Sequence, residues 1–349
     1  MKRADTPPRL HVALLAGGGG TRFWPLSRAR RPKQFLALVG RDPLMVAAWK
    51  RARRLAPRAR IWVVTPAALA PDVRRLLRGV RPDRLIVEPT PRDTGPAITL
   101  ACARIAAVDP QAVVGLFPTD HVVGDVAEFE RSVRAAVAAA RRGALVCLGI
   151  RPDRPATGFG YLRCSARPRR GTAVAVARFV EKPSAARARA FVASGKYLWN
   201  GGMFVWRASR FLEEAERAAP QLVGAVREFV GGRARAWARA PHRSVDFAVM
   251  ERARGVQVVP LEAGWDDVGS WDAAARLREA SGAHDRRHVL LDSAGSVVFA
   301  DRRLVALVDL PGVAVVDAPD AILVVPRRSA ERVRAVVEEL RRRGERRLV

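Results

Sequence analysis

Short apolar runs alternate with helical patterns over the first 150 residues of the chain. The apolar runs lie at 10–15, 60–65, 84–89, 112–118 and 144–150, with helical patterns between them at 43–55, 95–108 and 127–142. Strict alternation of this kind predicts βαβ units and a parallel, doubly wound sheet. From about residue 158 the rhythm changes to shorter strands at 158–164 and 172–183, a helix, and a loop-rich segment at 199–206.

The length of 349 residues predicts one large domain and one smaller one. We expect a flexible amino terminus at 1–9, a large α/β domain over 10–283 and a small β-rich domain over 284–349 that ends in a helix. Pairing with a second copy of the chain would bury the apolar, β-like pieces of this tail, so a homodimer is one expectation.

A net charge of +28 raises the hypothesis of nucleic-acid binding. The basic residues are spread along almost the whole chain, however, and no RRM, zinc-finger or basic-zipper pattern occurs, so we expect no specific nucleic-acid partner. No run of about 18 apolar residues and no signal peptide is found, which favours a cytoplasmic protein without a membrane partner. Cys102, Cys147 and Cys164 lack metal-ligand spacing and are expected to be reduced thiols.

Four consecutive glycines follow the first apolar run. In an open α/β sheet, ligands bind at the carboxyl ends of the strands, and glycines allow successive N–H groups to approach an anion closely. Arg22 and Lys33 follow the glycines and add positive charge, so the segment suits the phosphate chain of a nucleotide. Neither the P-loop pattern nor the dinucleotide fingerprint matches, and a purely structural turn stays an alternative.

Acidic residues follow two further apolar segments. Asp120 lies just beyond the run at 112–118, and Asp266 and Asp267 lie in GWDDVGSW. Mg²⁺ usually takes one or two protein carboxylates together with substrate phosphates, so Asp120 with either residue of the pair would suffice. The structural alternatives are a helix N-cap for Asp120 and turn residues for the pair.

Two other segments carry polar groups suited to a sugar phosphate. In FVEKP, Glu181 could accept hydrogen bonds from hydroxyls while Lys182 meets a phosphate, or the two could form an exposed ion pair. In WNGGMFVW, Asn200 stands beside glycines that permit close approach of a ring, or the segment is a β-turn between strands.

Together these segments resemble the sugar-nucleotide pyrophosphorylases and, within them, the mannose-1-phosphate guanylyltransferases. The resemblance covers about residues 10–326 and rests on AGGGGTRFWPLSR…PKQF, EPTPRDTGPAI, FPTDH, TGFGYL, FVEKP, WNGGMFVW, SVDFAVME and GWDDVGSW, in the family's order. It implies a Rossmann-like, GT-A-like nucleotidyltransferase fold with a mixed, mainly parallel sheet and flanking helices, plus the small β-rich domain.

The resemblance also implies roles for individual residues. Arg22 and Lys33 would be the catalytic cations on the triphosphate, and Asp120 and Asp267 would bind Mg²⁺. The implied nucleotide-binding residues are Ala16, Gly17, Gly18, Gly19, Gly20, Thr21 and Thr94, and the implied sugar-phosphate residues are Gly160, Glu181, Lys182 and Asn200. Asp93-Thr94-Gly95 departs from the family's usual Asn before Thr-Ala, so contacts to the base stay unassigned.

The implied reaction is GTP plus α-D-mannose 1-phosphate giving GDP-mannose and pyrophosphate, by in-line attack without a covalent enzyme intermediate. Because two polyanions must meet, positive charge and a metal in the site are required. The alternatives are a pyrophosphorylase for another hexose 1-phosphate or nucleotide, and a non-catalytic regulatory protein that binds nucleotide sugars. Relatives with a carboxyl-terminal isomerase domain are longer, and no isomerase activity is expected.

Overall fold

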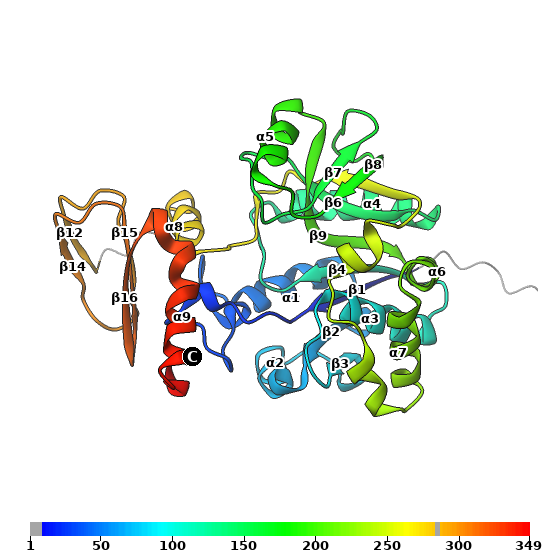
Figure 1. The fold of residues 1–349 in the computed structure, drawn as a ribbon, viewed down its shortest axis with the longest axis horizontal. Coiled ribbons are helices and arrows are strands. Elements are labelled where there is room, and N and C mark those ends of the chain that lie inside the picture. Colours follow the sequence, from blue (N-terminus) through cyan, green and yellow to red (C-terminus); the bar gives the residue numbers. More distant parts are fainter. Residues whose placement is uncertain (1–8, 283–286) are drawn as a thin grey trace, which may run out of the picture. The chain divides into compact units, whose positions relative to one another are not determined.

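The computed structural model describes residues 9–282 and 287–349, which divide into two compact units (Figure 1). The first unit comprises the chain up to Gly17 together with 49–118 and 123–265. The second unit comprises 18–48, 119–122 and the chain from Asp266 onward. The predicted boundary between 283 and 284, and the predicted flexible terminus except Arg9, lie outside the described residues.

A nine-stranded mixed sheet forms the centre of the first unit. Its strand order is β3-β2-β1-β4-β9-β6-β10-β8-β7. The strands are β1 (Leu10–Leu15), β2 (Ile61–Pro66), β3 (Leu85–Glu88), β4 (Val113–Pro118), β6 (Leu145–Ile150), β7 (Tyr161–Cys164), β8 (Val174–Val180), β9 (Tyr197–Arg207) and β10 (Val256–Pro260). β3, β2, β1 and β4 run parallel, as do β6 and β10, whereas β9 and β8 are antiparallel to their neighbours. The predicted α/β fold with a mixed sheet is confirmed.

The prediction of a loop-rich segment at 199–206 is wrong, because these residues lie within β9. Asn200, Gly201 and Gly202 do not end the strand but form a bulge against β6, where the pairing shifts between Cys147 and Gly149. Gly202 takes a left-handed φ of 64°, which accommodates the extra residues without breaking the ladder. These glycines, which are typical of a turn, therefore lie in a bulge of a strand that continues through the middle of the sheet.

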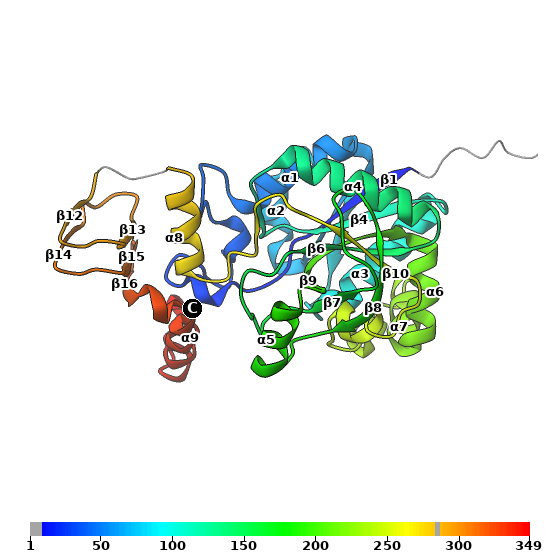
Figure 2. The same cartoon turned by 90° about the horizontal axis from the view of Figure 1, so that it is seen from above.

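Helices cover both faces of this sheet (Figure 2). The helices of the first unit are α2 (Ala70–Leu76), α3 (Thr94–Val108), α4 (Val126–Arg141), α5 (Ala185–Ser194), α6 (Ala208–Ala218) and α7 (Pro220–Val230). α3, α6 and α7 pack on one another, and α4 packs against β6, β9 and β10. The division between the units falls within α1 (Leu44–Leu55), β5 (Val122–Val123) and β11 (Trp265–Asp266).

The second unit is β-rich at its carboxyl end, as predicted. It contains β12 (Val289–Leu291), β13 (Val297–Phe299), β14 (Ala306–Val308), β15 (Val313–Ala318) and β16 (Ala321–Pro326), with helices α8 (Trp271–Ala280) and α9 (Val333–Arg342). β12 pairs in parallel with β14, and β13 with β15, while β16 runs antiparallel to β15.

The segment 18–48 belongs to the core of this second unit. Phe23 packs edge-on against Trp271, with ring centroids 5.0 Å apart, and Trp271 in turn contacts Phe299 at 4.6 Å. The indole N–H of Trp24 donates to the carbonyl of Leu348 at 2.7 Å. Residues more than 240 positions apart in the sequence thus stabilise one core, and burial of such aromatic side chains contributes several kcal/mol, on the order of 2–3 per ring.

Two expectations about the whole chain can be compared with the described residues. None of the described helices combines the length and apolar character required to cross a membrane. All three cysteines are unpaired and buried, and burial raises the pKa of Cys102 to about 12. These thiols are therefore protonated at neutral pH.

Glu88, at the end of β3, leads to a prediction about stability. Burial raises the pKa of its carboxyl to about 7, and its Oε1 is buried with no hydrogen-bond partner among the described residues. The contribution of protonated Glu88 to the stability of the folded protein is complete below the unfolded pKa of about 4.5. It is lost as the pH rises through the folded pKa of about 7. In Glu88→Gln, we expect the free energy of unfolding to fall less between pH 4.5 and 7 than in the parent protein, by up to about 3 kcal/mol.

Urea unfolding of both proteins at four pH values across this interval measures the difference between their pH slopes. Titratable groups that the two proteins share contribute equally to both slopes. Equal pH slopes for the variant and the parent would show that Glu88 does not ionise with a raised pKa.

Candidate functional site

The glycine run forms the turn after β1 that the sequence predicts. Ala16 is buried, and its N–H donates to the carbonyl of Val64 at 2.8 Å. The division between the two units falls between Gly17 and Gly18. At Gly20, whose φ is 58°, a Cβ would lie 2.5 Å from the Cβ of Lys33, so only glycine fits. Gly20 also precedes the single 3₁₀ turn that begins at Thr21.

Lys33 is the centre of a charged cluster in the second unit. Its side chain is buried, and its Nζ donates to Oδ2 of Asp120 at 3.0 Å and to the backbone carbonyl of Asp267. The same ammonium lies 5.9 Å from the ring centroid of Phe23. Residues from three segments of the chain are therefore joined by one cation.

Asp120 follows β4 and does not cap a helix. α4 begins at Val126, and Asp125 caps it by accepting from the N–H of Glu128 at 2.9 Å, so the N-cap alternative for Asp120 is wrong. Burial opposes ionisation of Asp120, but the charges of Lys33 and His121 outweigh it, and the net pKa lies below the usual value. Asp120 is therefore an ionised carboxylate at neutral pH.

The two acids of GWDDVGSW have different surroundings. Oδ1 of Asp266 accepts from the N–H of Val268 at 2.6 Å, which is the turn role given as an alternative. The carboxylate of Asp267 instead lies beside Gly269: a Cβ on this glycine would be 3.3 Å from Oδ2 of Asp267 and 3.5 Å from Nη1 of Arg22. Arg22 donates to the carbonyl of Gly269 at 3.4 Å. The absence of a side chain at Gly269 lets the carboxylate and the guanidinium approach the same point.

The donor set around Lys33 is chemically suited to Mg²⁺. Asp120 and Asp267 provide hard carboxylate oxygens, the ligands that this ion takes. No group of three or more metal-ligating side chains occurs within 9–282 and 287–349. A site of this composition needs further oxygen ligands, and water and substrate phosphates are the ones that Mg²⁺ usually keeps. The metal-binding roles of the two residues stay predictions.

A second cluster lies in the first unit, where the start of β7 and the end of β8 meet the bulge of β9. The N–H of Asn200 donates to the carbonyl of Gly160 at 2.8 Å, and its side-chain Nδ2 donates to Oδ1 of Asp246 at 2.8 Å. A Cβ on Gly160 would lie 2.4 Å from Oε2 of Glu181. That Oε2 is buried with no hydrogen-bond partner among the described residues. Three of the predicted sugar-phosphate residues are thus neighbours.

The acids of this cluster ionise with difficulty. Burial, and then the charge of Asp246, raises the pKa of Glu181 to about 7 against the opposing effect of Lys182. Burial also raises the pKa of Asp246 to about 6, although its hydrogen bond from Asn200 works in the other direction. Nζ of the largely exposed Lys182 lies 3.6 Å from Oε1 of Glu181, so the two form an ion pair, but it is not the exposed pair given as the alternative because the Glu181 side chain is buried. The orphaned oxygen of Glu181 suits a hydroxyl donor.

Sequence reasoning missed two members of this cluster, Asp246 and Glu251. Oε1 of Glu251 accepts from the N–H of Glu181 at 3.1 Å. Asp246 begins a π-helical turn, Asp246–Met250, and Glu251 caps its end by donating its N–H to the carbonyl of Asp246 at 3.0 Å. Such turns occur frequently at functional sites. Two acids five residues apart in SVDFAVME are the signal that could have found them.

Thr94, predicted to contact the nucleotide, begins α3. Its Oγ1 accepts from the N–H of Val245 at 3.0 Å, which ties α3 to the segment that carries Asp246. The preceding Asp93 takes a left-handed φ of 68° and accepts from the N–H of Thr94 at 2.7 Å. Thr94 therefore has a structural role in the first unit, and its predicted contact with the nucleotide stays a prediction.

Two family models match this chain, and together they cover most of its length. The model of the nucleotidyl transferase family matches residues 12–282. The chain belongs to this family. A second model, described as a mannose-phosphate isomerase/GMP-like β-helix domain, matches residues 286–340 of this nucleotidyltransferase.

Curated relatives match this nucleotidyltransferase over nearly its whole length. The xanthan biosynthesis protein XanB of Xanthomonas campestris pv. campestris (strain B100) is 40% identical over 346 residues, which are 95% of this chain and 73% of the relative. The mannose-1-phosphate guanylyltransferase of Escherichia coli K12 is 36% identical over 358 residues, covering 96% and 74%. The resemblance to mannose-1-phosphate guanylyltransferases is confirmed.

Solved structures share the fold. A crystal structure from Thermus thermophilus, named mannose-1-phosphate geranyltransferase, has a TM-score of 0.86 and 36% identity, covering 95% of this chain and 99% of that one. A UDP-glucose pyrophosphorylase from Acinetobacter baumannii matches at a TM-score of 0.54 and 18% identity, over 78% of this chain and 93% of that one. The second likeness is one of fold alone.

Proposed function

We propose that this nucleotidyltransferase is a mannose-1-phosphate guanylyltransferase, which converts GTP and α-D-mannose 1-phosphate into GDP-mannose and pyrophosphate. The observation that carries the proposal is the cluster in which Lys33 joins Asp120 and Asp267 beside Arg22. The names of the Escherichia coli relative and of the relative from Sinorhizobium fredii, 35% identical, support the choice of substrates.

In this proposal the second unit neutralises and orients the triphosphate. The N–H groups of Gly18 to Gly20 and the side chains of Arg22 and Lys33 would bind phosphate oxygens, so that the leaving pyrophosphate forms against fixed positive charge. Asp120 and Asp267 would hold Mg²⁺, which supplies further positive charge to phosphate oxygens when bound. Through its contacts with Asp120 and with the carbonyl of Asp267, Lys33 would also hold these two residues in position.

The first unit would bind the mannose 1-phosphate. Oε2 of Glu181, buried without a partner among the described residues, would accept from a sugar hydroxyl, and Asn200 can both donate and accept. The exposed ammonium of Lys182 would pair with the phosphate. The attacking phosphate is ionised at neutral pH, so its oxygen needs no general base. Positioning and charge then account for most of the rate acceleration.

A substrate panel tests this proposal directly. Purified protein is given each of four nucleoside triphosphates with mannose 1-phosphate or glucose 1-phosphate and Mg²⁺, and pyrophosphate release is measured. We expect kcat/KM to be at least about tenfold higher for GTP with mannose 1-phosphate than for any other pair. A higher value for another pair favours the alternative pyrophosphorylase, and nucleotide-sugar binding without turnover favours the regulatory protein.

Gly160→Ala should impair recognition of the sugar phosphate. The new Cβ would lie 2.4 Å from Oε2 of Glu181, so the carboxylate must move. We expect KM for mannose 1-phosphate to rise at least about tenfold while KM for GTP changes little. Gly158→Ala is the matched control, because a Cβ there meets no described atom within 4 Å. An unchanged KM in Gly160→Ala would remove Glu181 from the proposed sugar site.

Three further expectations accompany the proposal. Mg²⁺ dependence, a homodimer and a cytoplasmic location stay predictions. Chelation by EDTA followed by replacement with Mg²⁺ tests the first, and sedimentation of the purified protein tests the second.

A further inference from the structure

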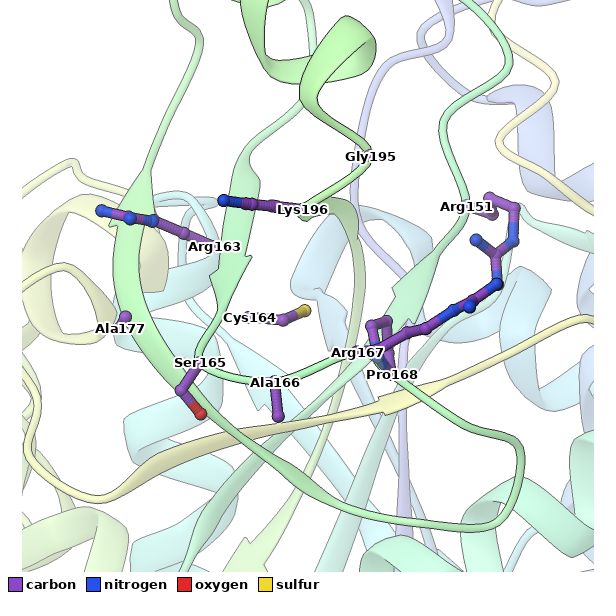
Figure 3. A pocket seen from close by; sticks show the side chains of 10 residues that line it. All are labelled: Arg151, Arg163, Cys164, Ser165, Ala166, Arg167, Pro168, Ala177, Gly195 and Lys196. Atoms are coloured by element: carbon purple, nitrogen blue, oxygen red, sulfur yellow. The ribbon is translucent and has the colours of Figure 1, made fainter.

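A pocket of about 820 Å³ lies in the first unit and contains none of the predicted substrate residues (Figure 3). Its walls come from the residue after β6, from β7 and the loop after it, from β8, and from the turn before β9. The lining residues are Arg151, Arg163, Cys164, Ser165, Ala166, Arg167, Pro168, Ala177, Gly195 and Lys196. Its volume is in the range of small-molecule sites.

The lining of this pocket is strongly basic. Four of its ten residues are Lys or Arg and none is acidic, whereas the whole chain has 62 basic and 34 acidic residues among 349. Figure 3 shows the side chains of Arg163 and Lys196 extending on one side and those of Arg151 and Arg167 lying on the other. The other six lining residues are small and carry no charged group.

Most of this charge is uncompensated. Arg151 shares the carboxylate of Glu262, at 3.2 Å, with Arg170. Arg163, Arg167 and Lys196 make no ion pair with any acid in the part of the chain that the structure describes. Like charges held near one another repel, so an anion that binds among them gains both attraction and relief of that repulsion.

The backbone fixes the positions of these cations. Arg163 is the register partner of Tyr197, and the next N–H, that of Cys164, donates to the carbonyl of Lys196 at 3.0 Å. Gly195 ends α5 with a left-handed φ of 62°, which turns the chain so that Lys196 leads directly into β9. Sheet pairing thus places the main chains of Arg163 and Lys196 side by side at one wall of the pocket.

We propose that this pocket binds a small organic bisphosphate, with one phosphate at each pair of cations. Cations on two sides of one pocket fit a ligand with an anionic group at each end better than a single compact anion. Guanidinium groups bind phosphate in a bidentate manner, and the lysine ammonium adds a point charge. The ligand is held without covalent chemistry: burial raises the pKa of Cys164 to about 11, so its thiol is no nucleophile at neutral pH.

Calorimetric titration with fructose 1,6-bisphosphate as the probe tests the proposal without any turnover. We expect one site per chain, and at least about tenfold weaker binding of fructose 6-phosphate, which has a single phosphate. In Arg167→Ser/Lys196→Ser, the affinity for the bisphosphate should fall at least about tenfold. The matched control Arg53→Ser/Arg235→Ser removes two exposed charges that are not in the pocket, and its affinity should change less than about twofold.

Every result of these titrations either supports or overturns the proposal. Equal loss of affinity in the two double variants, or no binding at about 5 mM probe, overturns the proposal. Equal binding of the two sugar phosphates overturns the bisphosphate class. If the double variant fails to fold, Lys196→Met keeps the side-chain stem and removes one charge, and the same comparison is made with Arg235→Met. Because only binding is measured, a failure of the proposed transferase activity gives a separate result.

Discussion

Lys33→Ala is expected to lower kcat for GDP-mannose formation at least about a hundredfold, the usual effect of losing one transition-state charge contact. The ammonium of Lys33 is buried and contacts Asp120 and Asp267, so no other cation can move into its place without repacking. Its loss also leaves the Asp120 carboxylate without its nearest positive charge. Steady-state kinetics with saturating substrates measures the effect.

Lys50→Ala is the control for Lys33→Ala, because Lys50 is an exposed lysine on α1. Its kcat should stay within about twofold of the parent value. Lys33 is proposed both to bind the phosphates and to pair with Asp120. A double-mutant cycle with Asp120→Asn separates these roles, because losses of kcat that depend on the pairing are not additive. A Lys33→Ala enzyme with the parent kcat would remove this residue from the proposed site.

Asp267→Asn is expected to reduce kcat by a similar factor, at least about a hundredfold, and to raise the Mg²⁺ concentration for half-maximal rate. The substitution keeps the shape of the side chain but removes the charge that lies beside Gly269 and Arg22. Because the backbone carbonyl of Asp267 is unchanged, its contact with Lys33 is retained. Rates measured over a Mg²⁺ titration give both quantities.

The neighbouring acid provides the control for this prediction. In Asp266→Asn the side chain still offers an oxygen to the N–H of Val268, which is the contact that Asp266 makes. The kcat of this variant should fall less than about threefold. Equal losses in the two variants would mean that the turn, and not the charge of Asp267, supports the activity.

The parallel strands could be predicted from sequence because each is a short apolar run bounded by turn residues. β1 begins and ends at the predicted residues, β4 begins one residue late, and β2 is shifted by one residue at both ends. β9 could not be predicted, since Asn-Gly-Gly is typical of a turn, and only pairing with β6 reveals the bulge. The packing of Phe23 on Trp271 has no local signal, because it joins residues far apart in the chain.

The candidate site was predictable where an acidic residue or a run of glycines follows the end of a parallel strand. Asp120 after β4 and the glycines after β1 follow this rule. The contact of Lys33 with the Asp267 carbonyl was not predictable, because backbone atoms carry no sequence signal. Asp246 begins a π-helical turn and Glu251 caps its end, and this five-residue spacing differs from the usual helical repeat.

The position of β9 in the sheet determines how the first unit unfolds. This strand pairs with β4 on one side and with β6 and β7 on the other, and its residues Leu198 and Phe204 are almost fully buried. Neither half of the sheet can separate without breaking the ladder of this strand. Amide protons of β9 that are hydrogen-bonded to neighbouring strands should therefore exchange with deuterium only when the entire unit unfolds, and their exchange rates should report its global stability.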